Sequence, residues 1–299
     1  MNDEFIKRIR ALRGGVGQQW LNDLPKIIQQ YEKKWQIRVD APFTLSYNYV
    51  APAKMIDGTP AVLKISFPKN HEFPSEIAAL TYFNGKAAIK VLQQDPDNDG
   101  VLLEKAEPGI AVRTVVSEKE RTSLVGKVIK QLHKPISDTA AFVSILDWAK
   151  AFDRYKSKFS KTGPVPQILF EKAEEIFKEY PKDNKPQVLL HGDLHADNML
   201  SSERGWLAID PKGIIGEAEF EVGGYLYNPY YDYPKGSDYK KLQTARILQF
   251  SQELGFAKER IRDWAFAYAV ISILWHLEDE GGFKPMYLQN AELLNEIRF

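Results

Sequence analysis

Three polar side chains in the second half of the sequence have the types and spacing that phosphoryl transfer needs. Asp193 and Asn198 lie in the segment His-Gly-Asp-Leu-His-Ala-Asp-Asn, and Asp210 follows the short apolar run 206–209. A carboxylate can accept the proton of an attacking hydroxyl. An amide oxygen and a second carboxylate suit Mg²⁺, which needs few protein ligands when it also binds phosphates. We therefore predict that Asp193 is a general base and that Asn198 and Asp210 are magnesium ligands.

The spacing of His191, Asp193 and Asn198 matches the H-x-D-x-x-x-x-N pattern of kinase catalytic loops. His191 and His195 are also placed as a pair of zinc ligands could be. However, no Glu follows His191 as in H-E-x-x-H, and the segment reads as a strand that enters a loop. We therefore predict no zinc site, and we expect His191 to orient the loop through hydrogen bonds.

The segments 191–198 and 209–212 resemble the aminoglycoside phosphotransferase family of small-molecule kinases. Gly192 stands where protein kinases carry Arg, and Asp210-Pro211 stands where they carry Asp-Phe-Gly. The similarity extends to residues 57–64 and 102–104, and within the family it is greatest to the streptomycin 6-kinase and hydroxyurea kinase branch. The resemblance implies a bilobal protein-kinase-like α+β fold, with a small N-terminal lobe built on an antiparallel sheet and a larger, mainly helical C-terminal lobe. It also implies ATP and Mg²⁺ as cofactors.

The composition limits the classes of partner. The chain has 299 residues, with 40 basic and 40 acidic side chains, so its balanced charge gives no support for binding nucleic acid or an anionic membrane. It has no cysteine, which excludes disulfides, thiolate catalysis and cysteine-based zinc sites. The first residues lack the apolar region of a secretory signal, and no long apolar run is present. We expect a cytoplasmic protein whose partner is a small molecule with a hydroxyl group; its oligomeric state is not predicted.

The pattern of apolar residues predicts the elements of each lobe. For the N-terminal lobe, residues 1–105, it predicts an amphipathic helix over 18–36, strands over 43–50 and 61–67 joined by a hairpin turn at 57–58, a helix over 76–83 capped by Ser75, and strands over 88–93 and 100–104. The C-terminal lobe, residues 106–299, is predicted to be mainly helical, with helices near 124–132, 140–156, 168–180, 238–254 and 258–279. Pro108-Gly109 interrupts the pattern near the lobe boundary.

Two charged residues of the N-terminal lobe are expected at the nucleotide. Lys64 ends Ala-Val-Leu-Lys, which corresponds to the Val-Ala-Ile-Lys strand of kinases, where the cation neutralises the α- and β-phosphates. Glu76 begins the next helix and can hold this lysine extended. Glu72 competes for the same role, but it precedes Pro74 and lies outside the expected helix.

The other nucleotide contacts are less defined. Residues 46–53 should cover the phosphates but contain no glycine, so Ser46 or Asn48 is expected to contact them. Gly15 and Gly17 do not form a dinucleotide motif, because no strand precedes them. The resemblance implies that residues 102–106 link the lobes and that backbone groups of Glu104 and Ala106 pair with adenine.

The acceptor site is predicted from acidic residues after Asp210. Glu217 and Glu221, with Asp232, could form an anionic pocket for a polycationic antibiotic, or they could be solvated or support helices. For residues 278–280 the structural interpretation is favoured. We predict an ATP-dependent kinase that phosphorylates a hydroxyl of a streptomycin-like aminoglycoside. The alternative is a kinase of another hydroxylated compound, such as a sugar, an amino alcohol or a hydroxyurea-like molecule.

Overall fold

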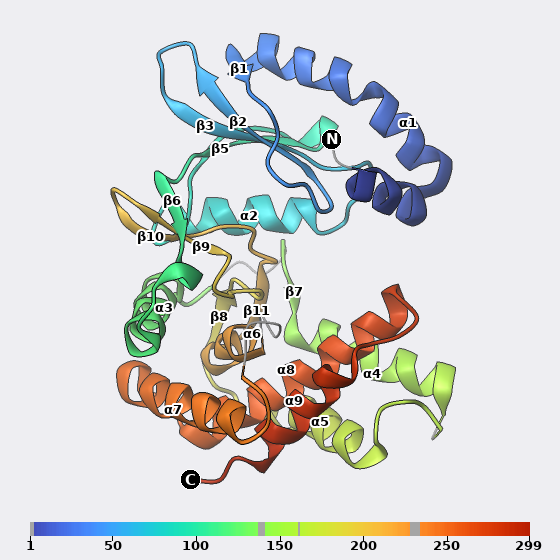
Figure 1. The fold of residues 1–299 in the computed structure, drawn as a ribbon, viewed down its shortest axis with the longest axis vertical. Helices are drawn as coiled ribbons and strands as arrows, with labels where there is room; N and C mark the ends of the chain where they lie inside the picture. Colours follow the sequence, from blue (N-terminus) through green and yellow to red (C-terminus); the bar gives the residue numbers. More distant parts are fainter. Residues whose placement is uncertain (1–2, 137–140, 161, 228–233) are drawn as a thin grey trace. The chain divides into compact units, whose positions relative to one another are not determined.

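The computed structural model describes residues 3–136, 141–160, 162–227 and 234–299. The chain divides into two compact units, residues 1–109 and 110–299. The first contains an antiparallel sheet with two helices, and the second is mainly helical (Figure 1). This content is that of the predicted protein-kinase-like α+β class.

The first unit is built on five strands in the order β1-β2-β3-β5-β4, and every neighbouring pair is antiparallel. Its elements are α1 (Asp3–Trp35), β1 (Ile37–Val39), β2 (Tyr49–Met55), β3 (Pro60–Ile65), α2 (Phe73–Phe83), β4 (Val91–Asp95) and β5 (Gly100–Glu104). Figure 1 shows α1 and α2 on opposite faces of this sheet. Alternate residues of β3 therefore point to different helices, which separates an apolar face from the face that carries Lys64.

Helix α1 is longer than the predicted 18–36 and contains a break at Gly14, whose φ of 52° is left-handed. Before the break, Phe5 and Ile9 are fully buried; after it, Leu24 is. A side chain would not fit at position 17, because a Cβ there would lie 2.6 Å from the carbonyl oxygen of Ile9. Gly14 and Gly17 therefore have structural roles in α1: the first allows the break, and the second allows close packing beside it.

The hairpin between β2 and β3 turns at the predicted residues, where the amide of Thr59 donates to Oδ1 of Asp57 at 2.9 Å. The predicted strand over 43–50 is wrong, because β2 begins only at Tyr49. Instead, the amide of Phe43 donates to the carbonyl oxygen of Val50 at 3.0 Å. Residues 43–48 instead form a loop that precedes the strand, and this bond ties the start of the loop to β2.

Helix α2 begins earlier than its sequence suggests. The predicted N-cap, Ser75, lies inside the helix, and the N-cap is Glu72. Pro74 occupies the first turn, where its missing amide leaves no intrahelical bond unmade. Proline therefore marks the inside of the first turn here, and the capping residue lies before it.

The second unit contains two small sheets and seven helices in the described part of the chain. Their order is α3 (Glu118–Leu132), β7 (Val143–Ser144), α4 (Ile145–Phe159), α5 (Gln167–Glu179), β8 (Gln187–Leu190), β9 (Met199–Ser202), β10 (Gly205–Ala208), β11 (Ile214–Glu217), α6 (Glu221–Tyr227), α7 (Ser237–Leu254), α8 (Lys258–Asp279) and α9 (Pro285–Glu296). The sheets have the orders β7-β11-β8 and β10-β9-β6, where β6 (Pro108–Ala111) includes the boundary between the units. Two of these short strands, β8 and β9, flank the loop that contains Asp193.

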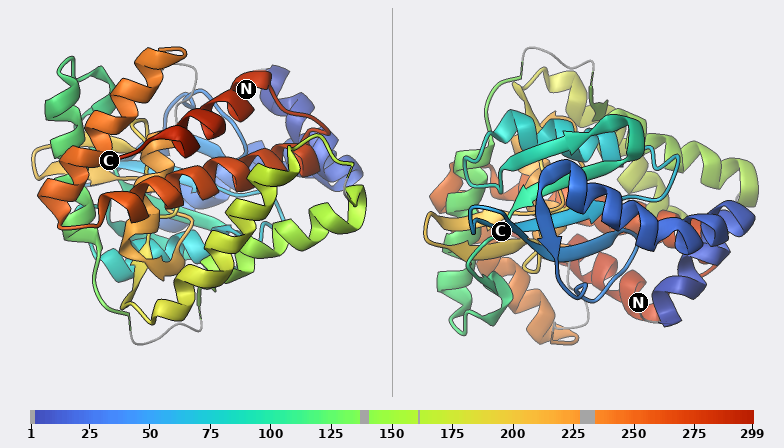
Figure 2. Two further views of the ribbon diagram at one scale, coloured as in Figure 1. Left: turned by 90° about the horizontal axis from the view of Figure 1, so that it is seen from below. Right: turned by 90° about the horizontal axis from the view of Figure 1, so that it is seen from above.

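Helix α8 forms the centre of the second unit. It contacts α4, α5, α6, α7 and α9, and Figure 2 shows α9 running alongside it. Its residues from Trp264 to Leu274 are buried. A helix that is buried on all sides belongs to the core of a large domain. No helix in the described residues is long and apolar enough to cross a membrane.

Candidate active site

The segment from His191 to Asn198 is the loop between β8 and β9, and its own hydrogen bonds fold it tightly. The amide of His195 donates to the carbonyl oxygen of Asp193, and the amide of Asn198 donates to that of His195, both at 3.0 Å. The Nδ2 group of Asn198 also donates to the carbonyl oxygen of Asp193 at 3.0 Å. The two residues predicted from their spacing are thus held together. Since Nδ2 is used within the loop, Oδ1 is the atom of Asn198 that suits a metal ion.

Asp210 follows the hairpin of β9 and β10, which pair antiparallel over Met199–Ala208. Backbone hydrogen bonds on both sides of Asp210 bind its segment to the loop 191–198, which we call the catalytic loop after the predicted role of Asp193. The amide of Ile209 donates to the carbonyl oxygen of Asn198 at 2.9 Å, and that of Lys212 donates to His191 at 2.7 Å. Asp210 has a φ of 58° and an exposed side chain. A non-glycine residue in this region is uncommon and is often found at functional sites.

His191 connects the same two segments through its side chain. Its Nε2 lies 2.7 Å from the carbonyl oxygen of Ile209, and its Nδ1 lies 3.3 Å from the amide nitrogen of Asp193. Burial lowers the pKa of His191, so the ring is neutral. The neutral ring then donates from Nε2 and accepts at Nδ1. The orienting role predicted for His191 agrees with these contacts.

Two carboxylates of the loop have different surroundings. The side chain of Asp193 is 28% exposed, and its Oδ2 lies 3.9 Å from Nε2 of His195. Asp197 instead binds Nε of Arg113 through Oδ1 at 3.0 Å. The predicted general base, Asp193, thus lies near a histidine ring, whereas Asp197 is paired with a guanidinium.

The carboxylate of Glu221 holds the start of the catalytic loop by accepting two of its backbone amides. Its side chain is fully buried; Oε2 accepts the amide of His191 at 2.6 Å, and Oε1 accepts that of Gly192 at 2.9 Å. Nε2 of His133 lies 3.2 Å from Oε2. Although burial raises the pKa of Glu221, these polar neighbours, His133 first, lower it overall, so the carboxyl is ionised. Its surroundings do not support the predicted role in an acceptor pocket. Sequence reasoning missed this anchor because only the fold brings residues 191 and 221 together.

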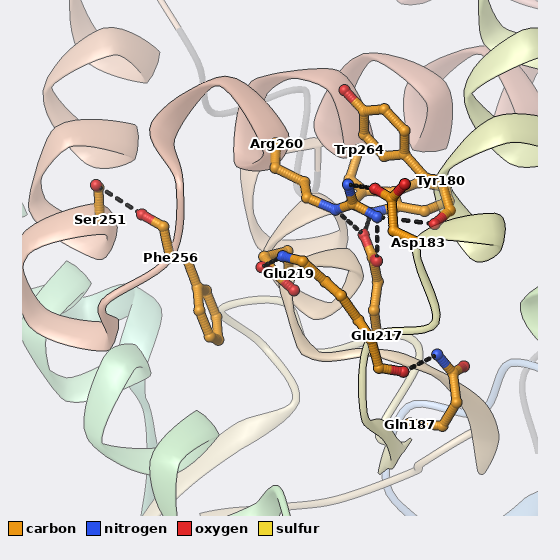
Figure 3. A network of polar contacts seen from close by, with 10 residues as sticks. Tyr180, Asp183, Gln187, Glu217, Glu219, Ser251, Phe256, Arg260 and Trp264 are labelled. Carbon is orange, nitrogen blue, oxygen red and sulfur yellow. Dashed lines mark hydrogen bonds and ion pairs between the residues drawn. The ribbon is translucent and has the colours of Figure 1, made fainter.

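Glu217, the second predicted acceptor residue, belongs to a buried network at the start of α8 (Figure 3). It is 2% exposed; its Oε1 lies 2.7 Å from Nε of Arg260, and its Oε2 lies 2.5 Å from Nη2. Trp264 Nε1 donates to the same carboxylate. Arg260 also binds the carbonyl oxygen of Tyr180 and the side chain of Asp183. Glu217 therefore joins β11 to α8 and is not available to a ligand.

The other acidic residues considered for the acceptor pocket are Asp232 and residues 278–280. Asp232 lies outside the described residues. Glu278 forms a two-pronged ion pair with Arg154, with N–O distances of 2.8 and 3.0 Å. Glu280 lies 3.5 Å from the ring of His276. These contacts agree with the structural interpretation favoured for residues 278–280.

In the first unit, Lys64 and Glu76 form the predicted ion pair. Nζ lies 2.6 Å from Oε1, and the two side chains are 4% and 9% exposed. Lys64 lies between Leu63 and Ile65 in β3, so alternation directs it toward the opposite face of the sheet. Glu72 is exposed at the N-cap of α2. The sequence thus identified the correct carboxylate of the two.

Some backbone groups of the predicted linker and of the predicted phosphate-covering loop have hydrogen-bond partners within the first unit. The amide of Glu104 donates to the carbonyl oxygen of Lys90 at 2.9 Å, which removes it as a donor to adenine. The carbonyl oxygen of Glu104 and the backbone of Ala106 stay candidates. Ser46 is exposed, and its carbonyl oxygen accepts Nη1 of Arg8 at 3.2 Å. Oδ1 of Asn48 is buried and has no hydrogen-bond partner among the described residues.

The site has the donors that magnesium prefers. Asn198 and Asp210 offer hard oxygen ligands on two connected segments. Within the described residues, no cluster of three His, Cys, Asp or Glu side chains could hold a metal alone. Two protein ligands completed by phosphate oxygens and water fit this donor set. This donor set fits a phosphotransferase, the class of protein expected from the sequence.

Comparison with known proteins identifies the family. The aminoglycoside/hydroxyurea antibiotic resistance kinase family matches residues 34–281, so the chain belongs to this family. It is 27% identical to a streptomycin 6-kinase of Streptomyces glaucescens, over 89% of this chain and 87% of that protein. It is 26% identical to a hydroxyurea phosphotransferase of Kitasatospora aureofaciens, over 89% and 77%. The solved structure of a choline kinase from Streptococcus pneumoniae has the same fold, with a TM-score of 0.64 at 15% identity over 92% and 99% of the two chains.

Proposed function

We propose that this phosphotransferase is an ATP-dependent kinase that transfers the γ-phosphoryl group to a hydroxyl of an aminoglycoside-type antibiotic. The observation that carries the proposal is the connection of the Asp193 loop to the Asp210 segment through His191 and Ile209. These hydrogen bonds join the loop that carries Asp193 and Asn198 to the segment that carries Asp210. Positioning and electrostatic stabilisation supply most of the rate gain in phosphoryl transfer.

Each unit has a proposed share in the reaction. Residues 1–105 bind the nucleotide, with Lys64 at the α- and β-phosphates, Ser46 in the covering loop, and Glu104 and Ala106 at adenine. Residues 106–299 carry catalysis and acceptor binding. When bound, ATP would supply the phosphoryl group, and magnesium would offset the negative charge of the phosphates.

Asp193 acts on the acceptor. Its partly exposed carboxylate would hold the acceptor hydroxyl and take its proton as the new O–P bond forms and the bond from the γ-phosphorus to the leaving ADP oxygen breaks. Asn198 and Asp210 hold the metal ion, and Glu76 keeps Lys64 extended. His191 stays neutral and aligns the loop, because both its ring nitrogens are bound to backbone groups.

The similarity to streptomycin 6-kinases supports streptomycin as the first choice of acceptor, and a role in resistance in the cytoplasm would follow. The similarity to a hydroxyurea phosphotransferase supports the alternative, another small hydroxylated compound. The buried states of Glu217 and Glu221 remove the two described carboxylates on which a polycation pocket had been predicted. The choice of streptomycin as the acceptor therefore depends on the sequence similarity to streptomycin 6-kinases.

Calorimetry with streptomycin and a non-hydrolysable ATP analogue tests this choice. We expect streptomycin to bind when the analogue and magnesium are present. Hydroxyurea, titrated under the same conditions, serves as the competing acceptor. Binding of hydroxyurea without binding of streptomycin at millimolar concentration would replace the antibiotic by the smaller acceptor.

Replacing Asp210 by Asn should weaken the magnesium-dependent part of ATP binding. The amide keeps the size of the side chain but lacks the charge that attracts the cation. Titration of magnesium at fixed ATP should give a curve displaced to higher magnesium concentration. Glu203→Gln, an exposed substitution in the same hairpin, is the matched control and should leave the curve in place. If both curves coincide with the wild type, Asp210 is not a metal ligand.

A further inference from the structure

The first part of α1 lies outside the segment that matches the family, which begins at residue 34. It nevertheless packs into the core of the first unit. Phe5 and Ile9 are fully buried in the same apolar cluster as Leu45 and Tyr49. The latter two residues lie within and just after the glycine-free loop 43–48. This helical segment and the loop therefore contribute side chains to the same apolar cluster.

Arg8 reaches from this segment to the tip of the loop. Its Nη1 donates to the carbonyl oxygen of Ser46 at 3.2 Å, and its guanidinium carbon lies 5.1 Å from the centroid of the Tyr47 ring. Its Nη2 lies 3.0 Å from Oε1 of Glu4, which orients the guanidinium, and the side chain is 32% exposed. A planar guanidinium can bind a carbonyl oxygen and an aromatic face at the same time, which an ammonium does less well.

We propose that Arg8 is a positioning residue that fixes the backbone of residues 46–48 for contact with the phosphates of the nucleotide. The inference rests on the proposed function, because it takes this loop as the phosphate cover. A loop without glycine cannot adopt left-handed conformations cheaply to follow a ligand. A loop that is held in place before binding loses less conformational entropy when the ligand arrives. Here the fixing group comes from the helix at the start of the chain.

The test compares nucleotide binding by Arg8→Ala, Arg8→Lys and the matched control Arg10→Ala in the whole chain. Arg10 lies on the same helix but binds Gln18 instead of the loop. We expect Arg8→Ala to bind ATP roughly three- to tenfold more weakly, the scale of one hydrogen bond with a cation–π contact. Arg8→Lys should recover part of this loss, and Arg10→Ala should match the wild type. Adenosine, which has no phosphate, should bind all four proteins equally.

A double-mutant cycle with Tyr47→Ala shows whether Arg8 acts through the loop. If it does, the loss in ATP affinity in the double variant is smaller than the product of the two single losses. Multiplicative losses, an unchanged affinity of Arg8→Ala for ATP, or an equal loss for adenosine would each overturn the proposal. If the wild type binds no ATP, the proposed function itself fails, which separates the two outcomes.

Discussion

Replacement of Asp193 by alanine should lower kcat by about 10²–10⁴-fold, the usual contribution of a general base. The affinity for ATP should stay close to that of the wild type, because Asp193 is proposed to contact the acceptor hydroxyl. Steady-state assays of ADP release and calorimetry with ATP measure the two quantities separately. The effect should fall on kcat because the lost interaction forms mainly in the transition state.

Asp197→Ala is the matched control for this variant, since it removes a carboxylate from the same loop. Asp197 is bound to Arg113, and we propose no role for it in proton transfer. We expect its kcat to fall far less than that of Asp193→Ala. Near-wild-type turnover in Asp193→Ala, or an equal fall in both variants, would show that Asp193 is not the base.

Replacement of Glu221 by alanine should lower the free energy of unfolding by about 2–6 kcal/mol, because two buried amide donors lose their acceptor at a cost of about 1–3 kcal/mol each. The carboxylate accepts two backbone amides of the catalytic loop and binds His133. Without it, the buried amides of His191 and Gly192 would lose their acceptor. Urea denaturation measures the change. Glu203→Ala removes an exposed glutamate and should leave the stability nearly unchanged.

The pH dependence of stability provides a second test for Glu221. Its pKa is lower in the folded chain than its ordinary value. Its ionised form therefore stabilises the fold above the unfolded pKa, and this contribution is lost as the pH falls through the folded pKa. The difference in stability between the wild type and Glu221→Gln should be largest near neutral pH and shrink in acid. A difference that does not change with pH would show that the charge of Glu221 is not what stabilises the loop.

The proximity of Asp193 and Asn198 could be predicted because these residues are close in sequence. Asp193 and Asn198 meet within one short loop, so their spacing alone fixes their proximity. The ion pair of Lys64 with Glu76 was also predictable, because a strand and the following helix leave few geometries for residues this close along the chain. In both cases local structure determines the contact.

The anchoring of the loop could not be predicted, because it depends on the packing of distant segments. Glu217 and Glu221 look like an acidic surface in the sequence, but each is buried against partners far along the chain. The strand predicted over 43–50 failed for a related reason. Its apolar residues suit a strand, yet Leu45 lies in a loop and is buried in the apolar cluster that also contains residues of α1, which the sequence around it does not reveal.

The most direct measurement is mass spectrometry of the acceptor after incubation with the wild-type chain, ATP and magnesium. The panel contains streptomycin, hydroxyurea, a sugar and an amino alcohol, and each reaction is repeated with Asp193→Ala. We expect streptomycin to gain one phosphoryl group in step with ADP formation, and we expect Asp193→Ala to form almost none of this product. Formation of the product at equal rates by both proteins, or no phosphorylated acceptor with any member of the panel, would contradict this expectation.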